Sequence, residues 1–224
     1  LSGDPKLIEI FKRGEDIHTA VASEVFDVPP EKVDREMRRR AKVINFGILY
    51  GMGVNALREN LGTDRADAER FLSEYFETFT TLAAYLERTK AEAHRRGYTE
   101  TLFGRRRQFE GIRSTIPHIR AMAERMALNA PIQGTSADII KLAMIRVDEH
   151  LKREGFTGEA FLILQVHDEL VYEVREQRIA ALVPEIKRMM EAVLSAEQAR
   201  GVPLVTSAAV GKNWGEMRGF PGSK

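Results

Sequence analysis

Apolar side chains recur every three or four residues along most of the chain, which is the pattern of amphipathic helices. The spacing predicts one helix over residues 33–50 and a longer one over residues 63–97. A further helical stretch covers residues 116–155 and contains Pro131 and Gly134. Proline removes a backbone donor and crowds the preceding turn, so a kink or two abutting helices are predicted at this point.

The period changes near the C-terminus, where residues 160–166 form a continuous apolar run and residues 170–174 are apolar and β-branched. His167, Asp168 and Glu169 separate the two runs, which predicts a β-hairpin with these residues at or near its tip. Helices dominate and a few strands lie near the C-terminus, so the predicted class is α+β. The other expected elements are a loop or short hairpin over 98–109, a helix over 177–198 and a last strand over 202–210.

Composition limits the kind of protein that this chain can be. Its 224 residues are 43% hydrophobic and 30% charged, and no apolar run approaches the roughly 20 residues of a membrane helix. The sequence has no cysteine, which excludes disulfides, thiol nucleophiles and cysteine-based metal sites. It begins at Leu1 without a signal-peptide pattern, so we expect a piece of something longer or a processed product.

Basic side chains are clustered although the net charge is only +1. Residues 35–58 hold six of them, and residues 95–113 hold six arginines, each group with few acids. Two basic patches in a nearly neutral protein predict a polyanion that is bound at defined places. Solvated helix faces explain the same clustering equally well.

Four side chains at a spacing of four residues are the first candidate site: Arg38, Lys42, Phe46 and Tyr50. Each step turns about 40° around a helix, so they form one winding stripe. Two cations followed by two aromatic rings match a nucleoside triphosphate laid along the helix, with its phosphates on the cations. The alternative is a basic amphipathic helix whose Phe46 and Tyr50 belong to the core.

The predicted hairpin tip offers carboxylates, the ligands that Mg²⁺ prefers. Neighbouring residues on a strand point to opposite faces, so Asp168 and Glu169 do not both bind one ion unless a turn or bulge intervenes. A partner acid must then come from elsewhere. The alternative is a polar hairpin turn.

Arg125, Asn129 and Gln133 form a third group, again spaced by four residues, although Pro131 disturbs the last step. Their side chains donate hydrogen bonds that suit the phosphate, sugar and minor-groove acceptors of DNA. A solvated polar face is the ordinary alternative.

In this order the three groups form a longer pattern: Arg38-x3-Lys42-x3-Phe46-x3-Tyr50-Gly51, Arg125-x3-Asn129-x3-Gln133-Gly134 and Gln165-Val166-His167-Asp168-Glu169. Together with Asn45-Phe46-Gly47-Ile48-Leu49-Tyr50-Gly51 and Thr101-Leu102-Phe103-Gly104-Arg105-Arg106, it resembles the family A DNA polymerases, the bacterial DNA polymerase I type. The similarity extends from Leu1 to about Glu216.

The resemblance implies an incomplete right-hand polymerase fold. A helix-rich fingers subdomain would cover residues 15–118 and part of an antiparallel-sheet palm residues 119–216. Residues 1–14 would lead into the fingers, and residues 217–224 would be a C-terminal tail. The implied activity is template-dependent transfer of a nucleotide from a dNTP to a primer 3′-hydroxyl in DNA replication and repair. The implied location is the bacterial cytoplasm, at the nucleoid and with no membrane.

The resemblance also assigns roles to single residues. For the incoming dNTP it implies contacts from His18, Arg38, Lys42, Phe46 and Tyr50, with Lys42 protonating the leaving pyrophosphate and Phe46 disfavouring dideoxynucleotides. For primer-template DNA it implies contacts from Gly51, Arg125, Asn129, Gln133 and His167. Asp168 would be a catalytic metal ligand and Glu169 a second catalytic carboxylate that supports the site.

One part of the family pattern is missing from this chain. The family's first catalytic aspartate, within Asp-Tyr-Ser-Gln-Ile-Glu, precedes a segment like the first five residues here, and Asp4 matches the loop after that strand. Two Mg²⁺ ions, or Mn²⁺ in their place, would be held by that aspartate together with Asp168. We therefore expect the chain alone to be inactive and to need an N-terminal portion, with the thumb and first palm strand, as its partner.

Two other functions fit some of these residues. A non-catalytic DNA-binding fragment would carry the same basic patches. An adjacent His-Asp pair is also found in metal phosphohydrolases, which would use His167 and Asp168. The other histidines, His18, His94, His118 and His150, lack the spacing of metal ligands.

Overall fold

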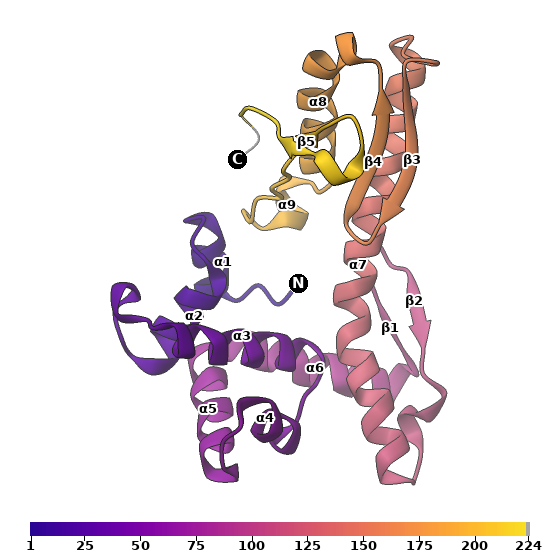
Figure 1. Ribbon diagram of the computed structural model, residues 1–224. Coiled ribbons are helices and arrows are strands. Elements are labelled where there is room, and N and C mark those ends of the chain that lie inside the picture. Colours follow the sequence, from indigo (N-terminus) through magenta and orange to yellow (C-terminus); the bar gives the residue numbers. More distant parts are fainter. Residues whose placement is uncertain (223–224) are drawn as a thin grey trace. The chain divides into compact units, whose positions relative to one another are not determined.

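The computed structural model describes residues 1–222, which form two compact units divided between Thr135 and Ser136. Each unit has its own hydrophobic core, and Figure 1 shows the elements in chain order. The first unit is mainly helical. Its elements are α1 (Pro5–Lys12), α2 (Ile17–Phe26), the 3-10 turn η1 (Pro30–Lys32), α3 (Arg35–Leu49), α4 (Val54–Leu61), α5 (Arg65–Thr78), α6 (Thr80–Arg96), β1 (Tyr98–Glu100), β2 (Arg106–Gln108), the 3-10 turn η2 (Glu110–Arg113) and the first part of α7 (Pro117–Arg153).

Aspartates begin four of these helices. Asp4, Asp16, Asp34 and Asp64 accept hydrogen bonds from backbone N–H groups in the first turns of α1, α2, α3 and α5. Each cap satisfies a donor that the helix leaves unpaired, which is worth about 1 kcal/mol. Asp4 is only 2% exposed, and its other carboxylate oxygen accepts from Leu82 N at 3.1 Å, so its role in this unit is structural.

A turn of the chain at Phe79 divides the single helix predicted over 63–97 into α5 and α6. Phe79 has φ −112° and ψ 61°, outside the helical range. Its fully buried ring packs against Tyr75, with the ring centroids 4.9 Å apart. The prediction of one helix is wrong, because Phe79 leaves the helical conformation while its side chain stays buried in the core of the first unit. Ile44 and Ile48 of α3 lie in the same core.

Helix α7 runs unbroken through Pro131 and Gly134, so the predicted alternative of two abutting helices is wrong. A Cβ atom on Gly134 would lie 2.6 Å from Thr101 Cγ2, and Leu102 N donates to Thr135 Oγ1 at 2.9 Å. Gly134 therefore lets the loop of the β1–β2 hairpin lie directly on the helix. The hairpin itself, predicted as one of two possibilities over 98–109, is present.

The second unit is built on an antiparallel hairpin, as predicted. Strands β3 (Ala160–Val166) and β4 (Glu169–Val174) pair up to Val166 opposite Glu169, with an irregularity between Leu162 and Leu164. Their core residues pack with Val147 of α7 and Leu182 of α8. The remaining elements are α8 (Glu176–Glu191), α9 (Ala196–Ala199), β5 (Ala209–Val210), the 3-10 turn η3 (Trp214–Glu216) and β6 (Arg218–Gly219).

Two predictions near the C-terminus are corrected. The helix expected over 177–198 is α8 followed by the short α9, because Ser195 and Gln198 form a capping box that begins a new helix. The strand expected over 202–210 is reduced to Ala209–Val210, which pairs with β6. Thr206 N donates instead to the Glu191 carboxylate at 2.9 Å.

The element content confirms the α+β class. Part of the predicted tail, β6, is paired with β5, and residues 223–224 lie outside the described residues. None of the helices in the described part of the chain is both long and apolar enough to cross a bilayer.

Candidate functional site

The stripe of two cations and two aromatic rings lies on the outer side of α3. Arg38 and Lys42 are exposed, Phe46 is 44% exposed, and Tyr50, which directly follows the helix, is 50% exposed. Ile44 on the inner side is 1% exposed. The alternative in which both rings belong to the core is therefore wrong, and the stripe is open to a ligand.

Arg38 is held in place by Asp16, the cap of α2. Its Nε donates to Asp16 Oδ2 at 2.9 Å and its Nη2 donates to Oδ1 at 3.0 Å. Because the guanidinium donates to both carboxylate oxygens, the pKa of Asp16 is far below its usual range. Asp16 stands two residues before His18 in the sequence and belongs to none of the three candidate groups.

His18 lies between the two helices that carry this pair. Asn45 Nδ2 donates to His18 Nδ1 at 3.2 Å, and the imidazole lies near the ring of Phe46, with centroids 5.7 Å apart. Burial lowers the pKa of His18, which favours the neutral form of the ring. Since Nδ1 accepts, the proton is on Nε2, which leaves a donor for a phosphate or hydroxyl oxygen.

Lys42 is the uncompensated cation of the stripe. Arg38 is paired with Asp16, and the neighbouring Arg39 and Arg40 are paired with Glu36 on the same helix. Among the described residues, Lys42 has no salt-bridge partner within 4.0 Å. One turn beyond Arg38, Lys42 therefore places an exposed positive charge that no acidic side chain of the described residues neutralises.

Gly51 brings the end of the stripe against α7. It has φ +64°, and a Cβ atom there would lie 2.9 Å from Arg125 Cγ and 3.1 Å from Arg125 Cα. The first and third predicted groups therefore meet within the first unit. Arg125 and Gln133 are exposed and Asn129 is half-buried, so the polar face of α7 is accessible.

Substitution of Gly51 by alanine is expected to destabilise the first unit more than the same change at Gly62. Both glycines have nearly equal positive φ, +64° and +65°, which costs an L-residue about 1–2 kcal/mol. Only Gly51 has a neighbour, Arg125, within 4 Å of the added atom, which adds about 1 kcal/mol or more. Chemical denaturation of the two variants measures the difference, and equal midpoints would contradict the contact.

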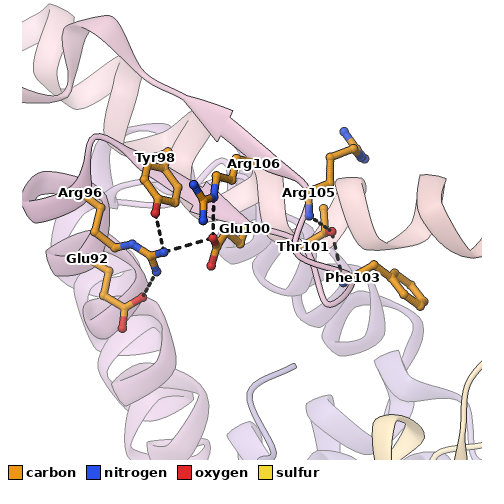
Figure 2. A network of polar contacts seen from close by, with 8 residues as sticks. All are labelled: Glu92, Arg96, Tyr98, Glu100, Thr101, Phe103, Arg105 and Arg106. Atoms are coloured by element: carbon orange, nitrogen blue, oxygen red, sulfur yellow. Dashed lines mark hydrogen bonds and ion pairs between the residues drawn. The ribbon is translucent and has the colours of Figure 1, made fainter.

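The β1–β2 hairpin carries the second basic patch, and much of its charge is paired internally (Figure 2). Arg96 donates to the Tyr98 hydroxyl at 2.6 Å and to Glu100 at 3.1 Å, and Arg106 donates to Glu100 at 2.9 Å. The two guanidinium groups lie 4.4 Å and 4.8 Å from the centre of the Tyr98 ring. This part of the patch is therefore a structural network.

The hairpin also lines a small cavity against α7. The cavity has a volume of about 70 Å³ and is bordered by Thr99, Arg105 and Arg107 of the hairpin and by Gln133 of the helix. Thr99 Oγ1 is buried there without a hydrogen-bond partner, and Arg105 donates to Gly134 O at 3.0 Å. In the sequence, Arg105 and Arg107 stand out as members of the second basic patch.

The His167–Asp168 turn belongs to the second unit. His167 adopts a left-handed conformation with φ 53°, and Gln165 Nε2 donates to its carbonyl oxygen at 2.6 Å. Glu169 begins β4, and all three side chains at the tip are exposed. No three His, Asp or Glu side chains of the described residues are grouped so as to hold a metal ion. Asp168 thus offers one carboxylate to a metal rather than a complete site.

These residues can be compared with those of known proteins. The sequence profile of DNA polymerase family A matches residues 1–216. The thermostable DNA polymerase I of Thermus filiformis is 45% identical over 218 residues, which are 97% of this chain and 25% of the relative. DNA polymerase I of Pseudomonas aeruginosa is 44% identical over 216 residues, 96% of this chain and 23% of the relative.

A solved structure agrees with these relatives. The POL domain of Pol1 from M. smegmatis, in complex with DNA primer-template and dNTP, matches with a TM-score of 0.83 and 40% identity, over 91% of this chain and 35% of that chain. The chain spans about a quarter of the length of the curated relatives. A family match over nearly the whole sequence is nevertheless sufficient: the chain belongs to DNA polymerase family A.

Proposed function

We propose that this chain is the fingers and part of the palm of a DNA-directed DNA polymerase, which transfers nucleotides from dNTPs to a primer 3′-hydroxyl. The observation that carries the proposal is the stripe on α3, whose cations and rings are exposed in a member of family A. The proposed division places the fingers in residues 15–118 and the palm in residues 119–216. Replication and repair of bacterial DNA, in the cytoplasm at the nucleoid, is the proposed setting.

The stripe would bind the incoming dNTP. Arg38 and Lys42 supply charge for the phosphates, and the neutral His18 supplies a hydrogen-bond donor at Nε2. Phe46 offers an apolar face to the sugar, and Tyr50 offers a ring at the template base position. Lys42 would also donate a proton to the leaving pyrophosphate. These groups would hold the triphosphate in line for attack by the primer 3′-hydroxyl on its α-phosphorus. The protein then contributes position and charge, and forms no covalent bond to the substrate.

The polar face of α7 would bind the primer-template. Arg125, Asn129 and Gln133 donate to phosphate, sugar and minor-groove oxygens or nitrogens, which positions the duplex without reading its sequence. Gly51 allows the end of the stripe to lie next to Arg125, so the nucleotide and DNA contacts adjoin. His167 would contact the primer end.

Asp168 would contribute to a site for divalent metal, Mg²⁺ or Mn²⁺. The hard oxygens of Asp168 and of its neighbour Glu169 fit such an ion in chemistry, whereas the described residues do not gather a complete ligand set. When bound, the metal would stabilise charge on the reacting oxygens. The proposed partner that completes the set is an N-terminal polymerase portion with the thumb and first palm strand.

A polymerase chimera tests the proposal. Residues 1–216 replace the matched segment of the Thermus filiformis enzyme, and we expect template-dependent primer extension with four dNTPs and Mg²⁺. A folded chimera that binds primer-template without extending it would favour a non-catalytic DNA-binding module instead. The 224-residue chain alone is expected not to extend a primer, and robust extension by it would contradict the assignment of a single metal carboxylate.

A further inference from the structure

We infer that Asp16 is a positioning residue for the triphosphate: it holds Arg38 by one edge of the guanidinium and leaves the other edge for a phosphate group. The inference rests on the proposed function of the stripe and adds a residue that lies outside it. Asp16 engages Nε and Nη2 of Arg38. The side chain of Arg38 makes no other hydrogen bond among the described residues, so its Nη1 edge keeps its donors for a ligand.

The carboxylate of Asp16 is itself anchored to α2. Asp16 Oδ2 accepts from Thr19 N at 2.9 Å and from Thr19 Oγ1 at 2.6 Å, in addition to Arg38 Nε. A carboxylate that is fixed by the first turn of a helix has little freedom to follow a moving arginine. Asp16 therefore sets the direction of the guanidinium, rather than the reverse.

The two helices that carry the pair share one core. Val21 and Ala22 of α2 are fully buried, as is Ala41 of α3, and they belong to the same cluster. The His18–Asn45 hydrogen bond joins the same two helices. Because α2 and α3 are packed together, the Arg38 side chain is ordered before a ligand arrives. Ordering a long side chain on binding otherwise costs affinity.

The negative charge of Asp16 weakens triphosphate binding, because a carboxylate near Arg38 repels phosphate. This effect opposes the gain in affinity from an ordered Arg38. Both side chains are about half exposed, 46% for Arg38 and 44% for Asp16, so this repulsion is weakened by solvent and salt. The ordering of Arg38 does not depend on salt in this way. At physiological ionic strength we therefore expect positioning to outweigh repulsion.

Asp16→Asn tests this directly. Asparagine caps a helix as well as aspartate does. Its amide group accepts hydrogen bonds at only one atom, however, so it cannot pair one oxygen with Nε and another with Nη2 of Arg38. Titration of the 224-residue chain with dATP, and separately with inorganic triphosphate, at about 0.15 M salt should give roughly two- to tenfold weaker binding. Asp16→Ser, also a good cap, should behave in the same way if the asparagine variant folds poorly.

Glu36→Gln is the matched control, because Glu36 holds Arg39 and Arg40 on the same helix but neither lies in the stripe. It removes the same charge and should leave binding unchanged. In an Arg38→Lys background, Asp16→Asn should have no effect, since lysine has no second edge to present. A capping role alone would weaken binding equally in both backgrounds.

Three results would overturn the inference. Binding by Asp16→Asn that is as tight as or tighter than that of the parent chain would show that repulsion dominates. An equal loss in the Arg38→Lys background would assign Asp16 to folding alone. If the parent chain binds neither dATP nor triphosphate, the nucleotide site itself is wrong and the inference is lost with it.

Discussion

Asp168→Asn in the polymerase chimera is expected to lower primer extension at least about a hundredfold while leaving binding of primer-template unchanged. Asparagine keeps the size of the side chain and removes the negative charge that a divalent metal requires. Asp168 is exposed at a turn and has no salt bridge among the described residues, so the substitution breaks no structural ion pair. Steady-state extension assays and a DNA-binding titration measure the two quantities.

Glu173→Gln is the control for this substitution. Glu173 is an exposed carboxylate on β4, the strand that follows the turn, and it lies opposite Phe161 in the hairpin. The same loss of charge there should not change extension. Comparable losses for both variants would mean that the general charge of the hairpin matters rather than a metal ligand at its tip.

Lys42→Ala is expected to lower kcat/KM for dNTPs roughly ten- to a hundredfold, the usual effect of losing one hydrogen bond to a charged group. The physical reason is that Lys42 is the cation of the stripe without a salt-bridge partner among the described residues. Its charge is available to a triphosphate. Single-nucleotide incorporation by the polymerase chimera, with the dNTP concentration varied, measures the effect.

Arg39→Ala provides the comparison on the same helix. Arg39 is also exposed, but it donates to both oxygens of Glu36, and its removal should change dNTP use little. Binding of primer-template should be the same in the two variants. If Lys42→Ala weakens DNA binding as much as dNTP use, then Lys42 contacts DNA and its assigned role is wrong.

Local patterns in the sequence were sufficient to predict those helices and hairpins that are determined by residues close together in the chain. The amphipathic spacing of α3 and the apolar runs around His167–Asp168 act within a few residues, and both predicted elements are present. The first and third candidate groups were found for the same reason, because a spacing of four residues is a property of one helix, whereas the second group was found at the turn between two apolar runs. Their roles as binding residues stay predictions.

Contacts between distant residues account for the failures. The predicted long helix is divided at Phe79, whose ring is buried in a core that includes α3. Helix α7 continues past Gly134, where the missing side chain leaves room for Thr101, more than 30 residues away in the sequence. The shortened last strand reflects a hydrogen bond from Thr206 to Glu191.

Spacing and residue type along the chain were sufficient to predict the family and the α+β class. The fold of the first unit was needed to show which side of α3 faces solvent, that Asp16 pairs with Arg38, that Lys42 has no salt-bridge partner among the described residues, and that Gly51 meets Arg125. The physical reason is that exposure and ion pairing depend on which elements pack together, and this depends on the free energy of the whole core rather than on any one segment.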